Sequence, residues 1–256
     1  TSTDTCDSGN PINILKNTKN KTDEVRLLIN GFVEFKPTKK LSVKSTYNID
    51  TRRYQNDYFA PSFIGAMRNP PPQPASGSLS TSKTYDWLLE NTINYQVKIA
   101  DHKFSALGVM SLQKNDYSSS YLSGSGFPDD IVQTLNAATI TSGSTNAETW
   151  SMVSYIGRLN YDYKEKYILT GTIRADGCSR FGANNKYGTF PSASFGWRIT
   201  NEKFIPKVKW LSDLKLRLSY GLSGNNDIGN YNQIPQVVSS NYNLSGVVVS
   251  GKTLSG

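Results

Sequence analysis

The sequence predicts an all-β protein that forms a segment of an antiparallel transmembrane β-barrel. Large apolar residues alternate with Lys, Arg, Ser and Gly from Leu214 to Leu222, so one face of this strand is apolar and the other is cationic. The alternation recurs along most of the chain, and aromatic residues gather at strand ends. A sheet of such strands turns its apolar face toward lipid, which takes the place of a protein core.

The composition agrees with this fold class. Hydrophobic residues make up 37% of the 256 residues, and no apolar run approaches the ~18 residues of a spanning helix. A barrel strand exposes only alternate residues to lipid, so a polar average is expected. The net charge of +8 is spread singly over strands and turns, which favours solvated strand faces and argues against a nucleic-acid partner.

Four hairpins are expected along the chain. Residues 1–23 are polar and predict a loop, residues 24–223 predict the partial barrel, and residues 224–256 predict a loop or the start of a further strand. Each hairpin is expected where two alternating runs flank turn residues. The paired runs are 25–36 with 41–50, 85–99 with 104–112, 153–163 with 167–175, and 193–199 with 214–222.

The connections between these strands differ in length. Turns at 37–40, 100–102 and 164–166 are short, whereas residues 54–83, 117–148 and 176–186 predict long loops. A short helix could form at 129–138, with Asp129 as its cap. Short turns on one rim and long loops on the other are the arrangement of outer-membrane barrels, in which the long loops are extracellular.

Alternation alone leaves two other architectures open. A soluble β-sheet carbohydrate-binding module would use the same pattern, although strands of soluble proteins are typically about five or six residues long. The strands expected here reach about ten residues, the length needed to cross a bilayer at a tilt. An independent barrel of about eight strands is the third possibility, because that number can close.

Long motifs then connect the chain with a known family. They are "YIGRLNYDYKEKYILTGTIRADGCSRFGANNKYGTFPSASFGWRITNEKF" and "WLSDLKLRLSYGLSGNNDIGNY" between Tyr155 and Tyr231, "WLLENTINY" at Trp87–Tyr95, and "GFPDD" at Gly126–Asp130. With these motifs the chain resembles the SusC/RagA-like TonB-linked outer-membrane transporters over nearly its whole length. The resemblance is weakest before residue 25 and after Tyr231.

The resemblance implies a barrel of about 22 strands in the bacterial outer membrane, with an N-terminal plug inside. It also implies energy supplied by TonB, uptake of oligosaccharides or peptides, and a SusD-like surface lipoprotein as lid. Only about eight strands are expected here, without a plug, a TonB box or a signal peptide before Thr1, so we expect a slice of a larger barrel. Cys178 stands where the family pattern RADGSSRFG has Ser, at a loop position.

Strand parity divides the candidate site residues into two sets. The first is expected to face lipid or to form an interfacial aromatic girdle, in preference to stacking on sugar rings. The second is expected to face the lumen. The first set is Tyr155, Tyr161, Tyr163, Tyr167, Trp197, Leu214, Leu216 and Leu218, and the second is Arg158, Arg174, Arg198, Lys215 and Arg217. Substrate or lid would bind on the loops at 55–83, 117–148 and Arg180–Gly182.

No enzyme is expected, and no cofactor. His102, the only histidine, lies in a predicted turn and is interpreted as a solvated residue. Asp86 and Glu90 share a strand face but lie roughly 13 Å apart, too far for paired-carboxylate hydrolysis. No nucleophile elbow or phosphate loop occurs in the sequence.

No metal site or disulfide is predicted either. Asn225, Asn226 and Asp227 suggest a calcium loop, but the ligand spacing is incomplete. Cys6 and Cys178 are too few for a disulfide framework or a metal site, and we predict no bridge between them.

Overall fold

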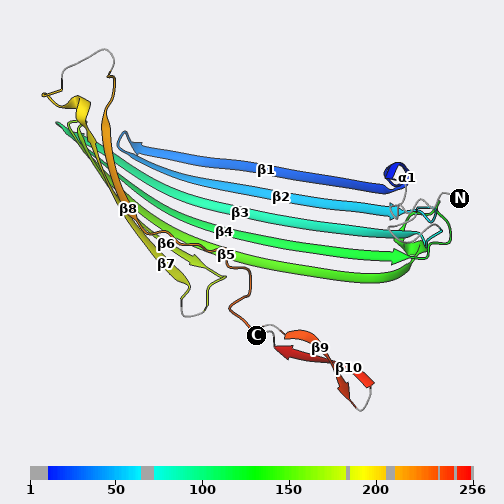
Figure 1. Ribbon diagram of the computed structural model, residues 1–256. Coiled ribbons are helices and arrows are strands. Elements are labelled where there is room, and N and C mark those ends of the chain that lie inside the picture. Colours follow the sequence, from blue (N-terminus) through cyan, green and yellow to red (C-terminus); the bar gives the residue numbers. More distant parts are fainter. Residues whose placement is uncertain are drawn as a thin grey trace. The chain divides into compact units, whose positions relative to one another are not determined.

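The computed structural model describes residues 11–64, 72–182, 185–205, 211–235, 237–244 and 247–254, and most of them lie in strands (Figure 1). Strands β1 to β8 form one sheet in which each strand pairs with its neighbours in sequence. The strands are β1 (Lys19–Thr38), β2 (Leu41–Ala60), β3 (Ser76–Ile99), β4 (His102–Ser125), β5 (Thr139–Tyr163), β6 (Tyr167–Cys178), β7 (Tyr187–Arg198) and β8 (Lys215–Gly221). Consecutive antiparallel pairing confirms the predicted fold class.

The turn between β5 and β6 shows how a hairpin closes. Lys164 and Glu165 both adopt positive φ angles, 54° and 57°. The backbone N–H of Lys166 donates to the carbonyl of Tyr163 at 3.0 Å, and the side chain of Asp162 accepts from the N–H of Glu165 at 2.8 Å. A type I′ turn requires positive φ angles at both central residues, and its twist matches that of the paired strands. The pairing then runs in unbroken register from Tyr163↔Tyr167 to Met152↔Cys178.

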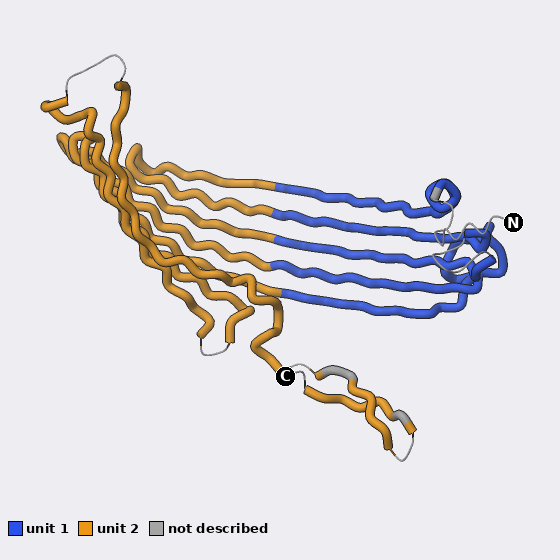
Figure 2. Tube along the Cα trace, viewed as in Figure 1, with its two compact units in different colours: residues 1–29, 49–86, 115–149 blue, residues 30–48, 87–114, 150–256 orange. Residues whose placement is uncertain are grey.

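The chain divides into two compact units, shown in Figure 2. Unit 1 comprises residues 1–29, 49–86 and 115–149, and unit 2 comprises residues 30–48, 87–114 and 150–256. Each of the five long strands β1 to β5 contributes residues to both units.

Unit 1 contains the only hydrophobic core formed by the described residues. Phe59, Ala75 and Phe127 are buried there, and the rings of Phe59 and Phe127 meet edge to face with centroids 5.1 Å apart. Leu135 and neighbouring alanines of the 3₁₀ helix η1 (Leu135–Ala137) pack against them. The connections after β2 and β4 thus close over a small apolar cluster.

Unit 2 has a different distribution of apolar side chains. Among its described residues, Cys178 is the only buried hydrophobic one, and it is a free thiol. Large side chains such as Leu159, Leu169 and Leu218 are at least half exposed. Cys6 lies outside the described residues.

The long-loop predictions were wrong over much of their length. Strand β2 extends to Ala60 and β3 begins at Ser76, within the loop expected at 54–83. Likewise, β4 extends to Ser125 and β5 begins at Thr139, within the loop expected at 117–148. These strand portions are mainly polar on both faces, so their sequence lacks the alternation that marked the rest.

Two local predictions also need correction. Residues 11–17, expected to be a loop, form helix α1 (Pro11–Asn17), which begins with proline, a residue favoured at the first helical position. Asp129 accepts hydrogen bonds from the N–H groups of Ile131 and Val132 as a cap would, but only η1 follows, at 135–137. Near the C-terminus, where the sequence predicts a loop or the start of a further strand, β9 (Val237–Leu244) and β10 (Val247–Leu254) form a separate two-stranded sheet.

Candidate functional site

The register of β5 to β8 places the predicted girdle and leucine residues on one face. Tyr163 is opposite Tyr167, Tyr167 is opposite Trp197, and Trp197 is opposite Leu216. Directly paired residues project to the same side of a sheet, so these side chains share a face, which we call the apolar face. Further pairs on it include Tyr155↔Ala175, Tyr161↔Leu169 and Phe195↔Leu218, and Leu214 directly precedes β8.

The predicted lumen cations lie on the opposite, polar face. Arg198 is opposite Lys215, and Arg217 is opposite Gly196. The side chain of Arg158 donates to the hydroxyl of Thr172 at 3.2 Å, and Arg174 forms an ion pair with Asp176 at 2.7 Å. The structure thus separates the two candidate sets by face; which face meets lipid remains a prediction.

The apolar face continues onto the earlier strands. The ring of Phe104 on β4 lies 4.9 Å from that of Tyr161 on β5, centroid to centroid. A Cβ atom added at Gly108 would lie 3.0 Å from the side chain of Ile93 on β3. Tyr47 on β2 and Trp87 on β3 also face one another, with ring centroids 6.2 Å apart. Alternate residues of all these strands therefore extend the same face.

The polar face of β1 and β2 carries a ladder of cross-strand pairs. Arg26 binds Asp50 through two hydrogen bonds of 3.0 and 2.6 Å. Arg52 pairs with Glu24 at 2.7 Å. These residues have even numbers on both strands, so the odd-numbered Val25, Leu27 and Ile29 belong to the apolar face.

The apolar face changes character along each long strand. On β1 it is apolar from Val25 to Phe35, which corresponds to about 33 Å of strand, or about 25 Å of thickness at a tilt near 40°. Beyond Val25, the same parity holds Lys19, Lys21 and Asp23. Strand β5 changes likewise: odd positions from 153 to 163 include tyrosines and Leu159, whereas those from 139 to 151 are Thr, Ser, Gly and Ala.

The short turns of unit 2 gather aromatic side chains. The ring of His102 lies 4.9 Å from that of Tyr163, and its Nδ1 atom lies 2.8 Å from the hydroxyl of Tyr161. Tyr163 also stacks near Tyr167, with centroids 6.4 Å apart. His102 therefore belongs to an aromatic cluster, and its predicted role as a solvated turn residue was wrong.

Glu202, which follows the 3₁₀ helix η2 (Ile199–Asn201), connects the β5–β6 turn with β6 and β7. Its carboxylate accepts hydrogen bonds from Lys166 Nζ at 2.7 Å, from the Tyr167 hydroxyl at 2.7 Å and from Trp197 Nε1 at 3.1 Å. These donors, the Lys166 ammonium first, lower the pKa of Glu202 to about 2. Sequence reasoning did not identify Glu202, because it lies in a connection without periodicity.

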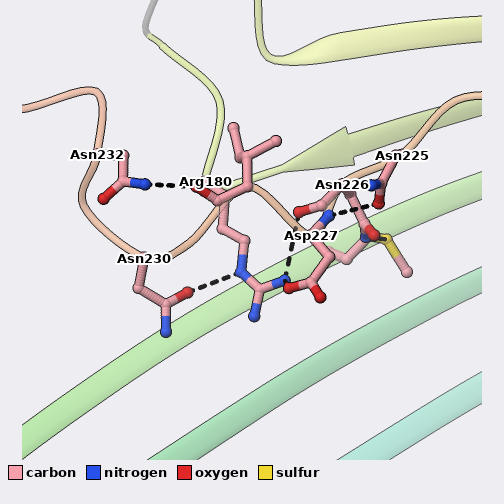
Figure 3. A network of polar contacts seen from close by, with 8 residues as sticks. Arg180, Asn225, Asn226, Asp227, Asn230 and Asn232 are labelled. Atoms are coloured by element: carbon pink, nitrogen blue, oxygen red, sulfur yellow. Dashed lines mark hydrogen bonds and ion pairs between the residues drawn. The ribbon is translucent and has the colours of Figure 1, made fainter.

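At the other end of these strands, Arg180 organises the loop after β6 and the segment after β8 (Figure 3). Its Nε donates to Asn230 Oδ1 at 2.7 Å, and its Nη1 lies 3.3 Å from the carbonyl of Asn226 and 3.4 Å from Asp227 Oδ1. The guanidinium also lies 4.7 Å from the ring centre of Trp150. The side chain is only 14% exposed. Two of the three residues suspected as a calcium loop, Asn226 and Asp227, thus bind an arginine.

A pocket adjoins this cluster within unit 2. It has a volume of about 410 Å³ and is lined by the Arg174–Asp176 ion pair, by the rings of Phe181 and Phe190, and by Asn226, among others. Phe190 is opposite Arg174 in the β6–β7 register, so both belong to the polar face. The pocket combines aromatic rings, amide groups and a charged pair.

The described residues contain no group of three or more His, Cys, Asp or Glu side chains able to hold a metal ion. Among the same residues, no helix is long and apolar enough to cross a bilayer.

Comparisons with known proteins agree on one family. No family model matches the sequence. TonB-dependent receptor P26 of Formosa agariphila is 32% identical over 256 residues, covering 96% of this chain and 25% of that protein. TonB-dependent receptor SusC of Bacteroides thetaiotaomicron is 45% identical over 101 residues, covering 40% of this chain and 10% of that protein. The chain therefore spans about a quarter of the length of TonB-dependent receptor P26.

Solved structures match the fold as well. The RagAB peptide transporter has a TM-score of 0.83 and 25% sequence identity, covering 94% of this chain and 27% of that chain. The RagAB peptide importer in the open-open state has a TM-score of 0.82 and covers 94% and 26%. None of these matches is a soluble carbohydrate-binding module. With eight consecutive paired strands, 32% identity to a TonB-dependent receptor over 96% of its own length, 45% identity to SusC over 101 residues and this structural match, the chain belongs to the SusC/RagA-like TonB-linked outer-membrane transporters.

Proposed function

We propose that this chain forms part of the barrel wall of an outer-membrane transporter for oligosaccharides or peptides. The observation that carries the proposal is the apolar face, whose extent of about 25 Å on β1 matches the apolar band of outer-membrane barrels. The apolar face would meet lipid, and the polar face, with Arg158, Arg174, Arg198, Lys215 and Arg217, would line the lumen.

Exposure of unit 2 supports this orientation. Val33 is 74% exposed, Leu159 is 68% exposed and Leu218 is 61% exposed. A contiguous apolar surface of this kind promotes association in water. In a bilayer, lipid chains cover the same surface, and no association is needed to shield it from water. The tyrosines and Trp197 near the short turns would lie at the membrane interface as a girdle.

In the proposed role the chain catalyses no reaction, and transport depends on other proteins. A SusD-like surface lipoprotein would act as a lid, and TonB would supply energy through a plug. The pocket at Phe181 and Phe190 offers rings and hydrogen-bonding groups to a substrate in the lumen. The name of the TonB-dependent receptor SusC supports TonB as the energy source, and that of the RagAB peptide transporter supports a peptide substrate; the lipoprotein lid and an oligosaccharide substrate follow from the family resemblance.

Spin labels at neighbouring positions of β8 test the orientation. We would attach a nitroxide to Leu218→Cys or Arg217→Cys, after replacing Cys6 and Cys178 by Ala, in the transporter reconstituted in lipid bilayers. Oxygen, which concentrates in lipid, should speed the relaxation of the label at 218 more than that of the label at 217. A water-soluble nickel complex should have the opposite effect and speed the relaxation of the label at 217 more. Equal water accessibility at both positions would refute the wall assignment.

Uptake and assembly are tested in cells. Deleting the encoding gene should abolish growth on one oligosaccharide or peptide source, and restoring the gene should recover it. Purification from solubilised outer membranes should recover a surface lipoprotein. Unchanged growth on every such source tested would count against a role in uptake.

A further inference from the structure

A second pocket lies in unit 1, where the apolar face becomes polar. It has a volume of about 370 Å³ and includes Val25, the last apolar residue of β1 on that face. Arg53 of β2 and Lys83 of β3 also line it. Both have the strand parity of the apolar face, as Tyr47 and Trp87 do. The pocket therefore opens on the side that would meet the membrane.

The charges around this pocket favour an anion. Neither Arg53 nor Lys83 forms an ion pair with any residue in the described ranges, and both side chains are exposed. The one carboxylate of the lining, Asp23, is already paired with Lys21 at 2.7 Å. Its charge is therefore offset, and the two cations of the lining remain available.

Hydroxyl groups complete the lining. Thr81 of β3 and Ser118 and Ser120 of β4 have the strand parity of the apolar face and contribute hydroxyls to it. A guanidinium can bind two phosphate oxygens at once, an ammonium adds a compact positive charge, and hydroxyls donate further hydrogen bonds. The combination suits a phosphate group.

We propose that this pocket binds the phosphate of a membrane lipid headgroup. The position favours a lipid over a soluble phosphate compound, because lipid headgroups lie where the hydrocarbon region ends, and the pocket begins where the apolar residues of β1 end. The inference rests on the proposed function, since only a wall segment turns this face toward lipid.

Lipid titration of the purified transporter in non-ionic detergent tests the proposal. The probes are a phosphorylated glucosamine-based lipid, the same lipid without phosphate, and inorganic phosphate, with bound lipid counted by native mass spectrometry. The wild type should bind the phosphorylated lipid about tenfold more tightly than the unphosphorylated one. Arg53→Gln with Lys83→Gln should remove most of that preference.

The matched control is Lys215→Gln with Arg217→Gln, which removes the same two residue types from the polar face and should keep the preference. Equal binding of both lipids by the wild type, or an unchanged preference in the Arg53/Lys83 double variant, would overturn the proposal. If inorganic phosphate bound as tightly as the phosphorylated lipid, the ligand of this pocket would be a soluble phosphate compound and not a lipid, which would also overturn the proposal. If the label at 218 contacts lipid while both lipids bind equally, only this inference fails; if that label does not contact lipid, the wall assignment fails.

Discussion

Strands β1 to β5 combine two kinds of segment that differ on only one side. In the segments that belong to unit 2, one face is apolar and the other polar. In those of unit 1 both faces are mainly polar, except on β1, where Val25, Leu27 and Ile29 already belong to the apolar face. Backbone pairing continues through both, because the ladder of a sheet does not depend on side-chain polarity. The comparison shows that backbone hydrogen bonding continues along the whole strand, while the side chains determine whether each part of the strand can face lipid or water.

The two units also gain stability from different sources. Unit 1 closes over Phe59 and Phe127, which are shielded by protein. Among its described residues, unit 2 buries one hydrophobic side chain and leaves many exposed. We therefore expect unit 1 to be sensitive to cavities and unit 2 to be sensitive to the surrounding lipid.

The largest expected effect comes from the core of unit 1. Phe59→Ala should lower the free energy of unfolding by about 3–5 kcal/mol, because it removes a side chain that is only 1% exposed and leaves a cavity. Chemical denaturation would measure the loss, which should be the same in detergent and in lipid. Phe63→Ala, at a 47% exposed phenylalanine, is the control. A similar loss in both variants would contradict a core at Phe59.

A charge on the apolar face should distinguish the two segments of one strand. Leu159→Arg should cost about 2–4 kcal/mol in lipid vesicles, as arginine does near a bilayer midplane. Thr145→Arg, on the same strand and parity but in the polar segment, should cost little. Unfolding in urea from vesicles of defined lipid would compare the two variants. Equal costs would show that both segments meet the same medium.

Arg180 tests how firmly the loop after β6 is held. Arg180→Gln should weaken the attachment of residues 225–232 by about 1.5–3 kcal/mol, because it removes charged hydrogen bonds and the contact with Trp150. Hydrogen exchange of residues 226–230 would report the loosening. Arg180→Lys retains the charge without the planar geometry, so it should restore little protection. Unchanged exchange would mean that other contacts hold the segment.

The smallest effect concerns pH at the short-turn end. The pKa of Glu202 is about 2 in the folded chain against an ordinary value of 4.5, so its carboxylate stabilises the fold above about pH 4.5. That contribution should decline as the pH falls from about 4.5 toward 2. The difference in denaturation midpoint between the wild type and Glu202→Gln should shrink over that interval. A difference that stays constant from pH 6 to pH 2 would contradict this role.

The sequence was informative wherever one face of a strand was apolar. The hairpin at 153–175, with Tyr161 and Leu169 facing one another, was predicted with its turn and parity. Residues 139–150 and 76–83 were missed as strands because polar residues on both faces produce no period of two. The only remaining signal there would have been β propensity, which is weak for Ser, Gly and Asn.

The prediction of site residues was likewise limited to what local sequence patterns indicate. Parity places Arg217 and Leu218 on opposite faces of β8, since alternation is a local property. The contacts of Arg180 with residues 226–230 and of Glu202 with Lys166 join positions some tens of residues apart. No local pattern predicts such contacts, because they depend on how loops meet in three dimensions.

The order of the sheet has a consequence for how the chain folds. Every strand from β1 to β8 pairs only with strands adjacent to it in sequence within the described part of the sheet. The β5–β6 hairpin closes through a three-residue connection, so little chain entropy is lost when its strands meet. Such a wall can grow by adding one hairpin at a time to an existing edge, and contacts close in sequence allow each addition to be fast.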